Sequence, residues 1–487
     1  MARGGRAFGV GLALVAAMGI VGQLGGCAGK QVAGTARAAG QIDTKNVGGK
    51  PVTDGPSGPR DGVPDSDLPF ENGDGGEMDK LAVNAVADIY DFWNEQLPAN
   101  FDGQKFEPLR RLVSYDSEGT AMKVCGTSTA GLVNAFYCGQ DDSISWDRGV
   151  LLPLLDKQFG KMSVVTVLAH EMGHAIQFRL GDKSNINQGT PTIVKEQQAD
   201  CYAGNFFRYV ADGKAKHFTI NTGEGLNKIL ATMFFIRDPA GLSANTRGAH
   251  GLAFDRVFAF QEGYTNGPKR CAAMDVDEIN QRITEKKRSL DDERTQGQAD
   301  ITNAKVFAAF KRGLDDAFKD NGAQPPQIKD NGSRCGRGDA TSPAAFCPDE
   351  NVVAIDLKKL TKIATPPRRN ETPGADGVGI GDFAAFAEIA SRYTLAIQKS
   401  IGATIEGEEA GLRTACLTGA WTGYVDRPPA ELRLAVGDLD EAVAELLLDD
   451  SLIAADVNGT KTEVGFARVE AFRIGYMEGS SKCTELG

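Results

Sequence analysis

Two histidines and a glutamate occur together in the order His170-Glu171-x-x-His174. On a helix, residues four apart lie on one face, so both imidazoles can reach one metal ion. Glu171 directly follows the first histidine, where it can hold a metal-bound water and accept its proton. The spacing predicts a zinc site with hydrolytic chemistry. The competing interpretation is a surface helix that carries two of the four histidines of the chain by coincidence.

A helix is expected at this motif, over residues 163–181. Its apolar residues recur near a period of 3.6 and would face a core. They are Val164, Val167, Leu168, Ala175 and Ile176. Gly181 then predicts the end of the helix.

A catalytic zinc usually takes three protein ligands and leaves one position for water. Glu196 lies 22 residues after His174, and Asp200 follows one helical turn later. On a second helix, Glu196 can complete the metal site, and Asp200 can accept the N–H of a ligating imidazole. Two acidic residues would otherwise suggest a solvated helix face, but the histidine pair needs a third ligand.

The composition limits the class of protein. A chain of 487 residues is too long for one ordinary domain, and 41% hydrophobic residues are enough for real cores. The net charge of −12 argues against a nucleic-acid partner, because no basic surface for phosphates is expected.

The N-terminus has the pattern of an export signal. Two arginines precede an apolar run over residues 8–24, which is short for a membrane span. The run ends in Leu-Gly-Gly-Cys27, which resembles the lipobox of bacterial lipoproteins. The resemblance implies a signal peptide over residues 1–26 and a diacylated Cys27 that anchors the chain to the outer face of the bacterial cell membrane. The alternative is an ordinary signal peptide with an incidental cysteine.

The following segment, residues 27–78, is rich in glycine, proline, aspartate and serine and has almost no aromatic residues. Such a composition buries too little apolar surface to fold. We therefore expect a flexible tether between the lipid and the folded body.

Eight further cysteines reveal a repeat. Their spacings recur as 13 and 70 residues, then 12 and 67. FDRVFAFQEGYTNGPKRC, which ends at Cys271, aligns without a gap with FARVEAFRIGYMEGSSKC, which ends at Cys483. The repeat predicts a tandem duplication, and an exported chain favours disulfides within each copy. The expected pairs are Cys125–Cys138, Cys201–Cys271, Cys335–Cys347 and Cys416–Cys483. The expected domains are residues 79–275 and 313–487, joined by a charged helical connector over residues 276–312.

The stretches HEMGHAIQ and EQQADCYAG resemble the bacterial family of predicted neutral zinc metallopeptidases and, more broadly, the gluzincins. The F-Y-C segment that ends at Cys138 and the segment from His250 to Cys271 extend the resemblance over residues 80–273. It implies that zinc is bound by His170, His174 and Glu196, with Glu171 as general base and then acid, and Asp200 behind the ligands.

The other two histidines are interpreted differently. His250 could donate to the oxyanion of a tetrahedral intermediate, or it could be a packing histidine before a helix. His217 is expected on the surface.

The second copy lacks every proposed ligand. The alignment places Ser391, Arg392 and Leu395 opposite the H-E-x-x-H residues. It places Gly411, Ala415 and Thr462 opposite Glu196, Asp200 and His250. This copy is expected to be a structural or recognition partner, or a lid.

Together these features predict an α+β fold, a duplicated zincin-like domain in which active-site helices pack with a small sheet. The expected function is peptide-bond hydrolysis on a peptide or protein substrate, with a strand near residues 143–146 pairing with it. Two alternatives remain: a zinc hydrolase of other substrates, and a non-catalytic envelope lipoprotein with a structural or vestigial zinc site.

Overall fold

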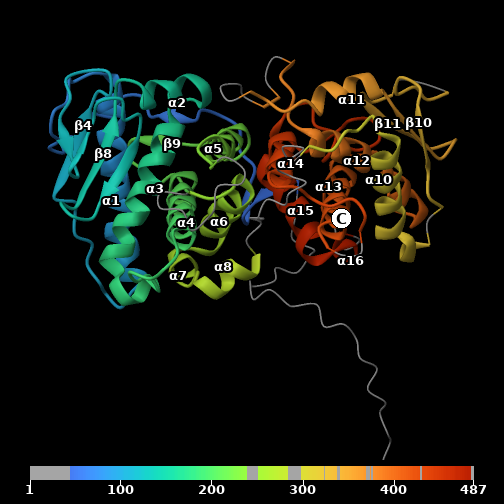
Figure 1. The fold of residues 1–487 in the computed structure, drawn as a ribbon. Coiled ribbons are helices and arrows are strands. Elements are labelled where there is room, and N and C mark those ends of the chain that lie inside the picture. Colours follow the sequence, from blue (N-terminus) through green and yellow to red (C-terminus); the bar gives the residue numbers. More distant parts are fainter. Residues whose placement is uncertain are drawn as a thin grey trace, which may run out of the picture.

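The computed structural model describes residues 44–238, 250–282, 298–322, 324–336, 340–368, 373–374, 377–427 and 430–483. The expected signal peptide and Cys27 lie outside these residues. Figure 1 shows two bodies side by side, a first half formed by the described residues up to 282 and a second half formed by those from 298 onward. Within the described ranges, no helix is both long enough and apolar enough to cross a membrane.

The first half contains a small three-stranded sheet. β8 (Ser143–Asp147) is its central strand, with β4 (Arg111–Tyr115) parallel on one side and β7 (Ala135–Cys138) antiparallel on the other. All residues of β8 are buried, as expected for a strand covered on both faces. β5 (Lys123–Val124) and β6 (Thr127–Ser128) form a separate hairpin.

The helices of the first half surround α3 (Met162–Leu180), the helix predicted from the apolar stripe. α1, α2, α4, α5 and β7 all contact it, so it is buried on nearly every side. It ends at Gly181, whose φ of 55° is available to glycine at little cost. The other helices are α1 (Glu77–Asn100), α2 (Leu151–Phe159), α4 (Thr192–Ala211), α5 (Glu224–Phe235), α6 (Ala253–Asn266), α7 (Pro268–Ala272) and α8 (Val276–Arg282), with a 3-10 turn at Gly181–Ser184.

The expected tether differs from the structure from residue 44 onward. β1 (Asn46–Val47) pairs with β2 (Lys50–Pro51), and β3 (Gly58–Pro59) pairs with β9 (Phe218–Thr219) of the body. Nε of Arg60 donates to the carbonyl of Phe218 at 2.9 Å. The composition was misleading because this segment is held by backbone pairing to the body, which needs few apolar side chains of its own.

His217 is buried, contrary to the prediction that it lies on the surface. Its Nδ1 lies 2.6 Å from Oδ1 of Asp88 in α1, and its backbone N–H donates to the other oxygen of the same carboxylate at 2.8 Å. A buried polar side chain requires such a partner, and the partner is 129 residues away.

The second half repeats the sheet. β12 (Val352–Ile355) lies between parallel β10 (Gln327–Asp330) and antiparallel β11 (Ala344–Cys347), the same order and directions as β4, β8 and β7. Its helices are α10 (Ala304–Ala317), α11 (Leu357–Ile363), α12 (Asp382–Ser400), α13 (Glu408–Val425), α14 (Asp438–Leu447), α15 (Gly465–Glu478) and α16 (Ser480–Cys483), with a 3-10 turn at Lys319–Asn321. The mixture of helices and small sheets agrees with the predicted α+β class.

Part of the expected connector belongs to the second half. α8 covers residues 276–282, and residues 283–297 lie outside the described ranges. α10 begins at residue 304 and packs on α12 and α13, so the second half starts earlier than the predicted residue 313.

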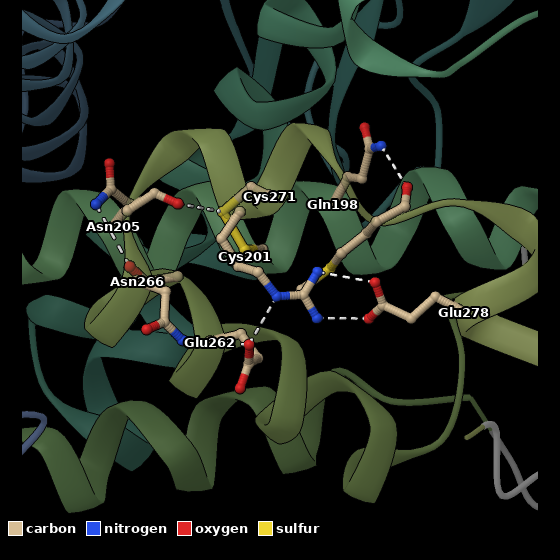
Figure 2. The surroundings of a disulfide bond; sticks show 11 residues. Gln198, Cys201, Asn205, Glu262, Asn266, Cys271 and Glu278 are labelled. Carbon is tan, nitrogen blue, oxygen red and sulfur yellow. Dashed lines mark hydrogen bonds and ion pairs between the residues drawn. A yellow bond between two sulfur atoms is a disulfide. The ribbon is translucent and has the colours of Figure 1, made fainter. Parts of the chain in front are cut away.

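Four disulfides join the predicted pairs, each within one half. Figure 2 shows the bond between Cys201 of α4 and Cys271 of α7. Beside it, Arg270 donates to both Glu262 and Glu278. This disulfide holds α4, the helix that carries Glu196 and Asp200, against the C-terminal part of its half.

Candidate metal centre

α3 presents the H-E-x-x-H residues toward α4. The imidazole rings of His170 and His174 lie 4.9 Å apart, and ligand atoms of both lie within 4.8 Å of a carboxylate oxygen of Glu196. The structure therefore brings together the three proposed ligands, from two helices separated in sequence by a turn and a loop.

A glycine between the histidines permits this approach. A Cβ added at Gly173 would lie 2.7 Å from the Cα of Ala199 in α4. Only glycine allows the two helix backbones to come this close, and Ala199 is flanked closely by Glu196 and Asp200. The close contact thus sets the distance between the histidine face of α3 and the acidic face of α4.

Two buried atoms at the centre face each other. His170 Nε2 lies 3.2 Å from Glu196 Oε2, and neither atom has a hydrogen bond of acceptable geometry within the described part of the chain. His174 Nε2 lies 3.5 Å from the other oxygen of the same carboxylate. Buried polar atoms without partners are costly, and imidazole nitrogen and carboxylate oxygen are both zinc ligands. These residues fit a zinc ion held by two histidines and one glutamate.

Asp200 lies behind the first ligand. Its Oδ1 is 2.7 Å from His170 Nδ1, and the side chain is fully buried. When Nδ1 carries the proton and donates it to Asp200, the lone pair of Nε2 is left for a metal. This is the orienting contact predicted from the spacing of Glu196 and Asp200.

Arg256 was missed by the sequence interpretation. This fully buried side chain, on α6, donates to both oxygens of Asp200, from Nε at 2.9 Å and from Nη2 at 2.8 Å. Its Nη1 donates to the carbonyl of Ile236 at 2.8 Å. The alignment pairs Arg256 with Arg468 of the second half, which marks this position as one that both halves share. A residue needed only for the fold would give the same match, so the alignment did not indicate a role at the metal site.

The charges at the centre are strongly coupled. Burial alone would lower the pKa of His170, but the charge of Asp200, the hydrogen bond to it and the nearby carboxylate of Glu196 raise it to about 10. Burial would raise the pKa of Glu196, yet the two histidines hold it well below its usual value. Burial would likewise raise the pKa of Asp200, and Arg256 and His170 lower it. Two ionised carboxylates are therefore buried here. Arg256 pairs with Asp200, and a cation between the two histidines would balance the charge of Glu196.

Glu171 points toward the sheet. Its Oε2 accepts the backbone N–H of Tyr137 in β7 at 2.8 Å, and its side chain is largely buried. β7 is therefore the strand beside the candidate base. The strand predicted to pair with substrate, residues 143–146, is the central strand β8, and both of its edges are already taken by β4 and β7. The prediction that residues 143–146 pair with substrate is therefore wrong, because order along the chain does not reveal order in the sheet.

His250 lies close to the metal ligands. Its ring centroid is 6.4 Å from that of His170, and its side chain is 42% exposed. Its backbone N–H donates to Asp238 Oδ2 at 2.5 Å, and its Nδ1 lies 3.6 Å from Oδ1 of the same carboxylate. The structure thus places a partly exposed imidazole at the edge of the candidate centre.

A hollow of about 690 Å³ lies one turn beyond His174. Tyr137 and Phe178 are among the residues that line it, and Phe178 is 67% exposed. Arg179 lines the same hollow and is held by Asp142 at 3.1 Å. The hollow adjoins β7 through Tyr137, and none of the proposed metal ligands lines it.

Comparison with known proteins points the same way. A family model described as "Putative neutral zinc metallopeptidase" matches residues 4–274, more than half of the chain. No curated protein and no solved structure matches the chain.

Proposed function

The chain belongs to this neutral zinc metallopeptidase family, and we propose that it hydrolyses peptide bonds with Glu171 as the general base and acid. The observation that carries the proposal is the convergence of His170, His174 and Glu196 beside Glu171. A purely structural zinc site has no need of a carboxylate held next to it, whereas a hydrolytic site does.

The residues have separable roles. His170, His174 and Glu196 would hold zinc, which when bound acidifies a water and polarises a carbonyl group. Glu171 accepts the proton of the attacking water and passes it to the leaving amine. His250, at the edge of the centre, donates to the oxyanion that forms on the carbonyl.

The substrate is placed along β7. Tyr137 directs its N–H away from β8 and toward Glu171, so this edge of the sheet faces the reacting groups. An extended peptide can add to such an edge through backbone hydrogen bonds. A substrate side chain would then enter the hollow between Tyr137 and Phe178.

The remaining predictions complete the proposal. The chain is exported and anchored through a lipid on Cys27 to the outer face of the bacterial membrane. Its two halves arose by duplication, as the repeated sequence and the matching sheets support. Its partners are a peptide or protein substrate and the membrane, and no nucleic acid.

The deciding experiment combines metal analysis with proteome-wide cleavage mapping for the parent and Glu171→Gln. We expect about one zinc per chain in both proteins and new peptide termini only with the parent. Zinc without cleavage in the parent would indicate a binding lipoprotein. Hydrolysis of esters or other carbonyl compounds without peptide cleavage would indicate a different zinc hydrolase. Absence of zinc would refute the site.

A further inference from the structure

The two halves contact each other through α5 and α6 of the first half and α14 and α15 of the second (Figure 1). The contacts are reciprocal. Phe254 of α6 lies 5.6 Å from Tyr476 of α15 between ring centroids, and Phe466 of α15 lies 5.5 Å from Tyr264 of α6. In the alignment, Phe254 corresponds to Phe466 and Tyr264 to Tyr476. Such reciprocity is the pattern of like units related by a two-fold axis.

Each half also caps a helix of the other. The N-cap residue of α6, Leu252, has no side-chain oxygen, and Oδ1 of Asp440 in α14 accepts the N–H of Phe254 at 3.2 Å. The N-cap residue of α15, Val464, has no side-chain oxygen either. Oδ1 of Asn227 in α5 accepts the N–H of Gly465 at 2.7 Å. Each contact satisfies an N–H group that the helix cannot satisfy itself.

The two capping residues, Asp440 and Asn227, differ in their other contacts. Asp440 is buried, and its Oδ2 also lies 3.2 Å from Nε of Arg237. The next residue, Asp238, accepts the backbone N–H groups of His250 and of the glycine after it at 2.5 and 2.6 Å. Asp440 therefore contacts the chain on both sides of the segment that carries His250.

The helix that Asp440 caps leads directly to a metal ligand. Arg256 lies in the first turn of α6 and donates to both oxygens of Asp200, which in turn contacts His170. Asn227 caps α15 instead, and in that half Ala415 stands where Asp200 would be. The first cap is connected to the metal centre, and the second has no such connection.

We propose that Asp440 is a positioning residue for the metal centre of the first half. By fixing the N-terminus of α6 and Arg237, it holds Arg256 and His250 in place. The second half thus contributes a residue that positions the metal centre of the first half. The inference rests on the proposed function for its activity measurement, but zinc affinity and backbone protection test it separately.

The test compares Asp440→Ala with Asn227→Ala in the full chain, since each variant removes one cap between the halves. For Asp440→Ala we expect about threefold to tenfold weaker zinc binding, measured by competition with a chelator. We also expect a lower kcat with little change in KM, and faster amide hydrogen exchange over residues 250–256 in the zinc-free protein. For Asn227→Ala we expect parent values in all three measurements.

Asp440→Asn serves as the conservative variant. Its amide oxygen can still accept the N–H of Phe254, but it lacks the charge that pairs with Arg237, so its effects should be smaller than those of Asp440→Ala. If Asp440→Ala fails to fold, this variant carries the same comparison.

Two results would overturn the inference: unchanged zinc affinity and exchange in the Asp440 variants, or equal losses in the Asn227 variant, which would show only a loosened interface. A parent that binds zinc but cleaves no peptide would refute the proposed function instead, and zinc affinity and exchange would still judge Asp440.

Discussion

The helix pair α3 and α4 of the first half and the pair α12 and α13 of the second half share a frame and differ in their chemistry. In both, the second helix is crossed closely by a later one. A Cβ added at Gly263 would lie 1.7 Å from the carbonyl oxygen of Cys201, and one added at Gly475 would lie 1.7 Å from that of Cys416. Each of these cysteines forms a disulfide with a Cα–Cα distance of 5.4 Å. The glycines and cysteines therefore serve the frame, with or without metal ligands.

Main chain fills the second half where the first half holds its candidate metal centre. Arg392, opposite Glu171, is fully buried and donates to three backbone carbonyls at 2.6–2.7 Å. They belong to Leu452, Ala455 and Asp456. A Cβ added at Gly411, opposite Glu196, would lie 2.4 Å from the carbonyl oxygen of Ala454. In the second half, Arg392 and the main chain of residues 452–456 therefore occupy the positions that correspond to the candidate metal centre.

Buried charges show the same contrast. In the first half, Arg256 and the histidines keep the pKa values of Asp200 and Glu196 low despite burial. In the second half, burial raises the pKa of Asp382 to about 6 and that of Glu445 well above its usual value. Neighbouring cations thus outweigh burial at Asp200 and Glu196, whereas burial outweighs its surroundings at Asp382 and Glu445.

The largest expected effect separates the reaction from the frame. Glu171→Gln should lower kcat for peptide cleavage by roughly 10²–10⁴-fold, because it removes proton transfer. Zinc content and the free energy of unfolding should change little, since the amide keeps the shape of the side chain. Steady-state kinetics with metal analysis measures both. Cleavage at the parent rate would show that the first half does not use Glu171 for catalysis, so its chemistry would no longer distinguish it from the second half.

The next largest effect concerns the buried ion pair between Asp200 and Arg256 in the first half. Asp200→Ala should lower the free energy of unfolding by about 3–5 kcal/mol, because the buried charge of Arg256 is left without its carboxylate. Denaturant unfolding of the zinc-free proteins measures it. Adding Arg256→Met should restore part of the loss, since the uncompensated charge is then removed. A loss below about 1 kcal/mol would show that Arg256 tolerates the removal of its carboxylate partner.

How far the sequence predicts this site depends on how local each signal is. His170, Glu171 and His174 lie within two helical turns, and the requirement for a third ligand led to Glu196 and Asp200. Arg256 lies 86 residues from His170, and no rule of spacing connects them. Its match in the second half suggested a role in the fold, and the contact with Asp200 appears only once α4 and α6 are packed together.

The fold was predictable to a similar extent. The apolar stripe predicted α3, and the repeat predicted the disulfide pairs. The order of strands in the sheet and the docking of residues 44–76 were not predictable, because both depend on backbone pairing with distant segments. His217 shows the same limit, since its burial depends on Asp88 in α1.

A smaller effect tests the raised pKa of a buried carboxyl group in the second half. Burial, together with the neighbouring Glu388, raises the pKa of Glu445 in the folded protein. The folded state thus keeps a proton that the unfolded state loses near pH 4.5. The free energy of unfolding should fall as pH rises from this value through the folded pKa, by about 1.4 kcal/mol for each pH unit between the unfolded and folded pKa values.

Glu445→Gln should weaken this dependence, because the amide does not titrate, while Glu388, whose pKa burial also raises, is still present. Unfolding midpoints measured from pH 4 to pH 8 should fall less steeply in the variant than in the parent. Parallel curves would show that Glu445 is ionised in the folded second half, which would remove the contrast in charge between the halves.

The smallest expected effect is the most direct test of the comparison. Ser391→His together with Leu395→His restores both histidine positions in α12, yet the zinc content should stay at about one per chain. The third ligand is still missing, and a glutamate at position 411 would meet the carbonyl of Ala454. Arg392 would also bring a positive charge beside the two imidazoles, which disfavours a cation. A second bound zinc, measured by metal analysis with the His170→Ala background as control, would show that the cleft of the second half can open. The difference between the two halves would then rest on the side chains at positions 391 and 395, and not also on the main chain of residues 452–456.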